Sequence, residues 1–485
     1  MTLAVVVVYL VILLVIGAVS SRRGSASAED YFLAGRSFGS FILFMALFGT
    51  NVTAFALLGL PGRSYHVGVG VFGFFGATAA FWGSALFVLL GYPIWKTGKQ
   101  YGFLTPTQMF AARWQSSGVG YLLLALLLLY TVPYIVIGIM GGGLAIAELS
   151  DGQLPYAPAA LLITVVTVTY TSLGGMRGTA WTNVFQASVF LIFLTFAAIA
   201  IARENGGATA LFQRLLETEP KLLERNFPAG IWATSFLVGP VSVIAFPHMF
   251  MRLLAARDPS ALRRTALVYP IALMFLFVPV TLIGVWGAVV HPGLVGPESD
   301  RILPLLVADA LPEAFAAIGL AAILAAVMSS LDGQLLTIST LLSVDVFHHG
   351  DETSARHYGR IAVVAVAAVA FAIALARPEA IFQISKYAFS GYTLIVPVIV
   401  AAFFVPRSTG RAVIIASVTA HLLLAAYYVP REWLPLPELP TFGVLPVAIC
   451  LSVEIVLLVV VSRWTPPSRT RFDDPFGRPG AGPAP

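Results

Sequence analysis

Hydroxyl and carboxyl side chains gather in the middle of one long apolar stretch, residues 320–347, LAAILAAVMSSLDGQLLTISTLLSVDVF. Ser329 and Asp332 are three positions apart and Ser330 and Gln334 four, so each pair shares one face of a helix. Hydrocarbon cannot satisfy such groups, which must therefore face protein, water or an ion. Their oxygen atoms suit a small hard cation. The alternative is a seam between two helices that Ser and Thr hydrogen bonds hold together.

The composition of the whole chain agrees with a membrane location for this stretch. Of 485 residues, 58% are hydrophobic and only 11% charged, which excludes a soluble protein. The single cysteine excludes an internal disulfide framework. The net charge of +5 does not indicate nucleic acid, because the basic residues lie in loops. The sequence contains no Walker A, HExxH or nucleophile-elbow motif, so we expect neither an enzyme nor ATP-driven transport.

The apolar runs predict an all-α polytopic membrane protein with about 13 transmembrane helices, since each crossing takes about 20 residues. The expected crossings are 2–20, 38–62, 66–94, 118–148, 155–173, 184–202, 229–254, 266–290, 313–346, 360–376, 380–405, 411–428 and 440–462.

The basic residues between these crossings are distributed unevenly. Of the 28 Lys and Arg, 19 fall on one side, 8 on the other and Lys386 within a helix. Arg252, at the end of the seventh crossing, counts here as an ordinary loop-side residue. The uneven split predicts that the N-terminus lies outside and the C-terminus in the cytoplasm. The first apolar run has no basic residue ahead of it, so we expect no cleavable signal peptide.

Two of the expected crossings are interrupted by residues that weaken a helix. The second crossing carries a polar, Gly-containing notch at 49–53, and the seventh contains Gly239, Pro240 and Pro247. They are five crossings apart, the spacing of a five-plus-five inverted repeat. Broken helices of this kind offer carbonyls to a cation and N–H groups to an anion. The alternative is a pair of ordinary kinks, which Gly and Pro often cause in membrane helices.

Five sequence stretches, in order along the chain, resemble the sodium:solute symporter family. They are AEDYFLAGRSFG at 28–39, GLPG at 59–62, SLGGMRGTAWTNVFQ at 172–186, FPHMFMR at 246–252 and AAVMSSLDGQLL at 325–336. The resemblance implies a LeuT-type core in which two inverted halves, 38–202 and 229–405, are joined by an extracellular loop, 203–228. It also implies one extra helix and loop at 1–37, two extra helices at 406–464 and a disordered cytoplasmic tail at 465–485.

The resemblance further implies a site for one coupling sodium ion between the second and ninth crossings. Carried over to this chain, its ligands are the backbone carbonyls of Gly49, Val52 and Ala326 and the hydroxyls of Ser329 and Ser330. Five neutral oxygens around a monovalent ion would give modest affinity and allow release. No organic cofactor is expected.

This chain departs from the family at two positions near the presumed ion path. Proline carriers have Asp where this chain has Asn51, and several members have Asp where it has Asn183. Each amide removes a favourable charge–charge term for a cation. Asp332 is then the nearest acid, either a protonatable group or a helix-packing hydrogen bonder. Proton-coupled or uncoupled transport on the same fold therefore remains an alternative.

The solute is expected beside the two interrupted helices. The candidates there are Asn51, Thr53, Phe55, Tyr134 and Ser242. Two further candidates, Gln383 and Lys386, lie in the eleventh crossing.

Lys386 either extends its amine to the membrane surface or provides the counter-charge of a carboxylate solute. The stretches PYIVIGIMGGG and FPHMFMR resemble the monocarboxylate and pantothenate branches. In addition, Gly239 and Val243 stand where proline carriers have aromatic residues. A monocarboxylate or related organic acid is therefore the favoured solute.

The sequence thus predicts a secondary active transporter of a bacterial-type inner (plasma) membrane, performing sodium-coupled symport of a small organic solute by alternating access. Its expected partners are the solute and the lipid bilayer, with no nucleic acid and no obligatory protein partner. An alternative of another class is a solute-sensing membrane module.

Overall fold

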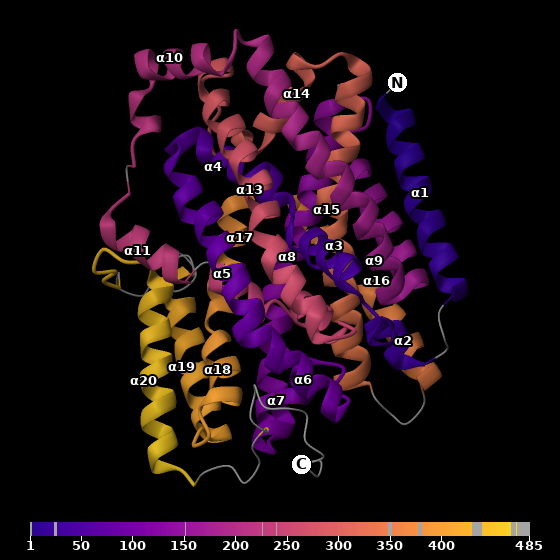
Figure 1. Ribbon diagram of the computed structural model, residues 1–485, viewed down its shortest axis with the longest axis vertical. Coiled ribbons are helices and arrows are strands. Elements are labelled where there is room, and N and C mark those ends of the chain that lie inside the picture. The colour runs from indigo at the N-terminus through magenta and orange to yellow at the C-terminus, as the bar shows by residue number, and fades with distance from the viewer. Residues whose placement is uncertain are drawn as a thin grey trace.

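The structure is a computed structural model that describes residues 2–23, 27–150, 152–225, 227–238, 240–347, 352–376, 381–428, 439–466 and 472. These residues form a bundle of helices (Figure 1), which confirms the predicted all-α fold. Its α-helices are α1 (Thr2–Arg23), α2 (Ala28–Leu33), α3 (Ser40–Asn51), α4 (Leu60–Val67), α5 (Ala77–Leu86), α6 (Tyr92–Tyr101), α7 (Pro106–Trp114), α8 (Ser117–Leu149), α9 (Tyr156–Glu204), α10 (Ala208–Thr218), α11 (Ala229–Val238), α12 (Pro247–Leu254), α13 (Pro259–Val290), α14 (Ile302–Ala310), α15 (Glu313–Leu341), α16 (Glu352–Ala376), α17 (Ile381–Thr393), α18 (Val396–Phe404), α19 (Gly410–Tyr428) and α20 (Pro446–Trp464). Short 3₁₀ or π turns connect several of them: η1 (Ala34–Arg36), η2 (Phe55–Gly59), η3 (Phe72–Gly76), η4 (Phe87–Gly91), η5 (Pro220–Leu223), η6 (Pro240–Ala245), η7 (Gly296–Arg301) and η8 (Leu342–Val346).

Many of these helices are long and apolar enough to cross a membrane. Within the described residues there are 10 such helices, or up to 12 if each of two bent pairs forms one span. This number is lower than the predicted thirteen, which is not confirmed. The count takes α9 as one span, although its 49 residues would extend about 70 Å, roughly twice the hydrocarbon thickness.

A break at Gly175 divides α9 into segments 156–174 and 176–204. Gly175 has φ 54° and ψ −152°, a conformation that L-residues rarely adopt. A Cβ atom there would also lie 2.7 Å from the carbonyl oxygen of Tyr31, so the position needs glycine for space as well. The two segments correspond to the fifth and sixth crossings expected from the sequence.

Both interruptions predicted from the sequence are present as bends. α3 and the segment Phe55–Val67 meet at 58°, and Ala229–Ala245 meets Pro247–Leu254 at 56°. At the first bend Val52 is extended, with φ −85° and ψ 113°. At the second, Phe246 has φ −62° and ψ 121° immediately before Pro247, whose ring disfavours a helical residue ahead of it. Gly239 lies outside the described residues.

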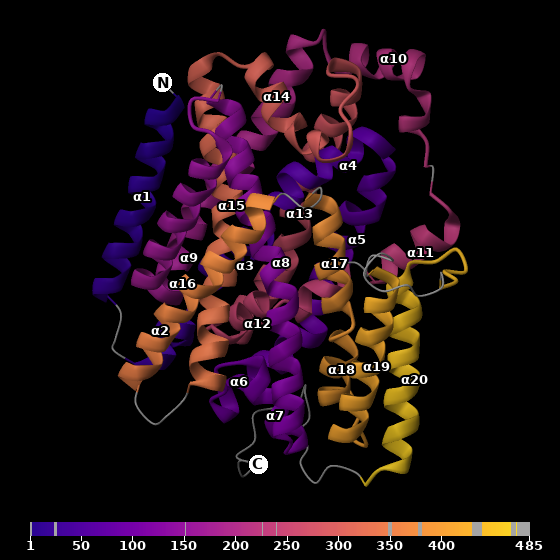
Figure 2. The same ribbon diagram turned by 180° about the vertical axis from the view of Figure 1, so that it is seen from behind.

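α15 forms the centre of the bundle. It packs against α9, α8, α1, α16, α3 and α12, and every residue from 319 to 341 is buried. Figures 1 and 2 show α15 in the interior, whereas α1 and α20 lie at opposite edges of the molecule. The polar side chains of α15 therefore face protein, as their cost in hydrocarbon requires.

Short helices occupy several of the connections between the long helices. The loop after α9 contains the surface helix α10, which buries Leu211 and Leu215 and exposes its polar face. The C-terminal segment 465–485, expected to be disordered, lies outside the described residues except for 465, 466 and 472.

Candidate functional site

The broken end of α3 and the middle of α15 meet through Ser329. Its hydroxyl lies 2.8 Å from the carbonyl oxygen of Gly49 and 2.9 Å from that of Ala326, within hydrogen-bonding distance of both. All three residues are fully buried. Three of the five oxygens expected around sodium therefore converge on one point, although Gly49 and Ser329 are 280 positions apart.

The other two expected ligands lie on the same two elements. Ser330 is buried, and its hydroxyl donates to the carbonyl of Val327 on its own helix at 2.9 Å. Val52 is extended at the end of α3, which takes its carbonyl out of the helical repeat. A hydroxyl can rotate its proton away and present two lone pairs, and carbonyl oxygens only accept. The chemistry of this neutral oxygen set thus fits a small monovalent cation.

A buried ion pair lies one turn of α15 beyond Ser329. The Arg252 guanidinium on α12 is 3.7 Å from Oδ1 of Asp332, and both side chains are at most 1% exposed. Oδ2 of Asp332 accepts hydrogen bonds from the Tyr170 hydroxyl at 3.2 Å and the Thr182 hydroxyl at 3.1 Å. Pairing offsets part of the large cost of placing either charge in this interior.

Arg252 corrects one expectation from the sequence, which counted it as an ordinary basic residue of the loop side. The side chain is buried and belongs to the ion pair instead. The signal that could have identified it was the lone carboxyl group on a buried helix, which requires a nearby cation or a proton.

Asn183 joins the two members of this ion pair. In the amide orientation that satisfies all neighbours, its oxygen accepts from Arg252 at 2.9 Å and from the Thr50 hydroxyl at 2.7 Å. Its nitrogen then donates to Oδ2 of Asp332 at 3.3 Å. A carboxylate at position 183 could accept from Arg252 but could not donate to Asp332. The amide is therefore the side chain that matches a neighbouring acid at 332.

The solute candidates from the two breaks lie close to this region. The Asn51 amide donates to the hydroxyl of Tyr269 at 2.7 Å, a partner that the sequence did not suggest. The Tyr134 hydroxyl lies near the side chain of Thr53. Ser242 is buried in η6, directly before the bend at Pro247.

An aromatic cluster lies next to these candidates. Phe55 contacts the rings of Phe75, Phe382 and Phe389, with centroids 5.2, 5.7 and 4.9 Å away. Phe389 also contacts the Tyr134 ring at 5.5 Å. Phe55 therefore has its backbone at the α3 break and its ring in a partition of four phenylalanines.

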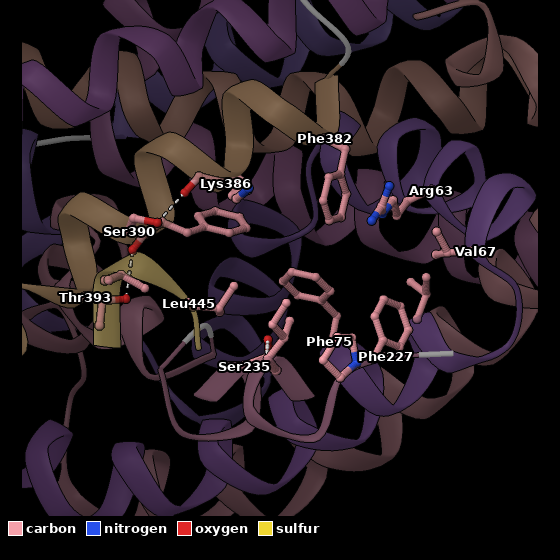
Figure 3. Close-up of a pocket in the computed structure, with 15 residues that line it drawn as sticks. Arg63, Val67, Phe75, Phe227, Ser235, Phe382, Lys386, Ser390, Thr393 and Leu445 are labelled. Atoms are coloured by element: carbon pink, nitrogen blue, oxygen red, sulfur yellow. Dashed lines mark hydrogen bonds between the residues drawn. The ribbon is translucent and has the colours of Figure 1, made fainter. Parts of the chain in front are cut away.

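The two candidates from the eleventh crossing differ in their surroundings. Lys386 lines a cavity of about 380 Å³ beyond the aromatic partition (Figure 3), together with Arg63. Gln383 is exposed and is not among the residues that line this cavity. The structure thus brings Asn51, Thr53 and Tyr134 together but separates them from Lys386.

Comparisons with known proteins agree with this architecture. The model of the sodium:solute symporter family matches residues 31–419. A sodium/pantothenate symporter of Haemophilus influenzae is 27% identical over 390 residues, which cover 75% of this chain and 76% of the relative. A sodium/proline symporter of Escherichia coli is 26% identical over 483 residues, which cover 94% of this chain and 92% of the relative.

A solved structure shares the fold. The structure of a Na⁺-coupled sialic acid symporter superposes with a TM-score of 0.78 at 18% sequence identity, covering 96% of this chain and 98% of the other. This similarity confirms the predicted LeuT-type fold. The family model covers most of the chain, so the resemblance expected from the sequence is also confirmed. The chain therefore belongs to the sodium:solute symporter family, an integral membrane family of transporters and not of enzymes, whose coupling ion is sodium.

Proposed function

We propose that this chain carries a small organic acid into the cell together with sodium, by alternating access. The observation that carries the proposal is the junction of Ser329 with Gly49, where a hydroxyl of α15 meets the broken end of α3. An ion held by the carbonyls of Gly49, Val52 and Ala326 and the hydroxyls of Ser329 and Ser330 would bind both elements at once. Sodium would therefore stabilise the conformation in which α3 and α15 are in contact.

The same break in α3 would couple the ion to the solute. Asn51 and Thr53 follow Gly49 within four positions, and the Tyr134 hydroxyl lies near Thr53. Ser242 belongs to the second broken helix. A solute bound by these groups gains affinity when sodium orders the break, and the ion gains the same factor from the solute because linkage is reciprocal.

An organic acid is the solute class that the comparisons favour. Pantothenate, proline and sialic acid, the solutes named for the relatives and the structural neighbour, each carry a carboxylate. The N–H groups at the start of a half-helix favour such an anion. We assign a monocarboxylate or a related organic acid to this chain, as the sequence suggested.

The arrangement in the membrane is also a proposal. We infer that the N-terminus lies outside and the C-terminus in the cytoplasm, with 38–202 and 229–405 as the inverted halves. The excess of Lys and Arg on one side supports this orientation. In Figure 1, α1 begins at the upper end of the molecule and α20 ends at the lower end, consistent with an odd number of crossings.

Uptake by the purified protein in liposomes tests the proposal. A screen of radiolabelled monocarboxylates, amino acids and sugars, each with an inward sodium gradient and with a potassium gradient as control, identifies the solute. Sodium-dependent accumulation of a carboxylate supports the proposal, and equal uptake under both gradients would refute sodium coupling.

Proton coupling is a second candidate because the buried Asp332 is an acid at the side of the ion site. Uptake driven by an inward pH gradient in sodium-free buffer, and lost in Asp332→Asn, would favour it. Sodium-driven uptake that needs no pH gradient would argue against it.

A further inference from the structure

An apolar groove runs along the outside of the bundle, between α5 with the η4 turn and the start of α13. This α5–α13 groove has a volume of about 470 Å³. Val88 on one wall and Leu267 on the other are 50% and 64% exposed. In an integral membrane family such exposed apolar side chains face hydrocarbon. The apolar part of the groove therefore suits a lipid chain.

Each wall of the groove is one face of a helical segment. The α13 wall has the spacing of a single helix face and consists of Pro259, Leu262, Arg263, Ala266 and Leu267. The other wall consists of Ser84, Phe87, Val88 and Tyr92. The hydroxyl of Ser84 donates to the carbonyl oxygen of Ala266 at 2.6 Å, which joins the two walls. The groove is thus a product of the packing of α5 on α13.

A cation without a protein partner lies at one end of this groove. Arg263 lines the groove and is exposed, and within the described residues its side chain forms no hydrogen bond or ion pair. Arg263 lies in the second turn of α13, four positions before Leu267. The guanidinium therefore lies near the membrane surface, while the apolar lining continues toward the membrane interior.

The protein surface beyond this end of the groove belongs to α6 and to the segment that precedes α13. The ring N–H of Trp95 donates to the carbonyl oxygen of Ala256 at 2.7 Å, which places the two segments side by side. Lys99 lies over the Trp95 ring, 5.2 Å from its centroid, and donates to the carbonyl oxygen of Arg257 at 3.2 Å. A second exposed cation is therefore fixed on this surface.

The charge balance of this end of the groove favours an anion. Residues 92–101 and 255–266 contain five basic residues and one acid, Asp258, which is paired with Arg257. In Figure 1, α6 lies toward the lower end of the molecule, where α20 also ends. This end is the cytoplasmic side in the proposed orientation, and anionic lipids of that leaflet attract basic segments beside the membrane.

Two neighbouring grooves lack such a cation. The α9–α13 groove, of about 370 Å³, is formed by residues within 191–195 and 268–275, and none of its described lining residues is charged. A groove of about 560 Å³ between α1 and α9 is lined in part by Arg177, but this guanidinium is paired with Asp30. The α5–α13 groove differs from both because it combines an apolar lining with an unpaired guanidinium.

We propose that the α5–α13 groove is a binding site for an anionic phospholipid. One acyl chain lies between the two walls, and the phosphate binds to Arg263, whose planar guanidinium matches two phosphate oxygens. The lipid contacts α5 of the first proposed inverted half and α13 of the second. Its binding requires neither sodium nor solute, because no residue of the α5–α13 groove belongs to either site.

Photolabelling with two lipid probes tests the proposal. Phosphatidylglycerol and phosphatidylcholine, each with the same diazirine-bearing acyl chain, are added to the full-length protein in nanodiscs of phosphatidylcholine, and the attachment points are mapped by mass spectrometry. We expect the phosphatidylglycerol probe to label residues 84–92 and 259–267 about tenfold more than the phosphatidylcholine probe. The uncharged α9–α13 groove is the internal control, which both probes should label equally.

Variants test the role of Arg263. Arg263→Gln should lower labelling of the α5–α13 groove by phosphatidylglycerol about tenfold, whereas Arg263→Lys, which keeps the charge, should retain most of it. Arg264→Gln is the matched control, because it removes the same charge from an exposed neighbour that does not line the groove. Its effect should be about twofold at most. Ser329→Ala should leave labelling unchanged even where it abolishes sodium-dependent uptake, so this proposal and the proposed function can fail separately.

Four outcomes would overturn the inference. Equal labelling of the α5–α13 groove by both probes would mean that the headgroup is not recognised. Equal losses in Arg263→Gln and Arg264→Gln would indicate a general effect of surface charge. Protection by sn-glycerol 3-phosphate as strong as that by phosphatidylglycerol would identify a site for a free phosphate. Cross-links between two protein chains in place of lipid label would identify a second copy as the occupant.

Discussion

Ser329 and Gly49 lie 280 positions apart, yet the hydroxyl of the first is 2.8 Å from the carbonyl oxygen of the second. The contact joins the central helix α15 to the point where α3 loses its helical repeat. Ala326 supplies a further carbonyl at 2.9 Å from the same hydroxyl. A cation at this point would stabilise one relative position of the two elements, which is the requirement for coupling ion binding to movement.

Ser329→Ala should weaken the sodium dependence of uptake. The substitution removes one oxygen from the expected set, and we expect the sodium concentration for half-maximal uptake to rise about tenfold or more, since one such interaction is worth about 1–1.5 kcal/mol. The measurement is initial uptake rate against sodium concentration in liposomes. Ser339→Ala, a change of the same kind further along buried α15, is the control. An unchanged sodium dependence in Ser329→Ala would refute the proposed ion site.

Asp332 and Arg252 should behave as a coupled pair. Asp332→Asn or Arg252→Met alone leaves one buried charge uncompensated, which typically costs about 3–5 kcal/mol. The double variant removes both charges and should cost less than the sum of the single changes. Apparent unfolding temperatures of the purified variants, compared in a double-mutant cycle, measure the coupling. Strictly additive losses would mean that the 3.7 Å contact contributes no coupling energy.

Asn183→Asp should destabilise the protein because it places a second carboxyl group beside Asp332. The new side chain keeps an acceptor for Arg252 but loses the donor that faces Oδ2 of Asp332. We expect a loss on the order of 2–4 kcal/mol, part of which Asn183→Asp combined with Asp332→Asn should restore. Thermal unfolding of the three variants tests this. A double variant less stable than either single change would contradict the proposed bridging role of the amide.

Asp300 should make stability depend on pH. It lies in η7, outside the spans, and accepts a hydrogen bond from the first N–H of α17 at Ile381, 2.8 Å away. Burial raises the pKa of Asp300 to about 7, and the Ile381 bond opposes this. The unfolded chain loses the proton near pH 4, so the stabilisation is complete below that pH and is lost as pH rises through about 7.

Asp300→Asn should therefore flatten this dependence, because the amide stays neutral and still accepts from Ile381. The full change between pH 4 and 8 is at most about 4 kcal/mol, given about 1.4 kcal/mol for each pKa unit. Unfolding temperatures at both pH values are compared with those of Glu298→Gln, an exposed carboxylate of the same segment. A slope that persists in Asp300→Asn would assign the pH dependence to other groups.

Much of the architecture could be predicted from the sequence because its causes are local. Continuous apolar length sets the helices that can cross a bilayer, and Gly and Pro mark where α3 and the α11–α12 pair bend. Hydrocarbon cannot satisfy the polar groups at 329–340, so a helix that carries them through a membrane must bury them in protein. The burial of α15 therefore also follows from its composition.

The partners of these groups were decided only by the tertiary structure. In a membrane protein both the lipid-facing and the protein-facing sides of a helix are apolar, so a sequence pattern does not reveal which faces meet. The sequence therefore placed Arg252 among the basic residues of the loops, whereas in the structure it is buried against Asp332. Lys386 was likewise a solute candidate together with Asn51. In the structure it lines a separate cavity, and the ring of Phe389 lies between the two. The sequence determined which residues must be buried, and the packing of distant helices decided which of them meet.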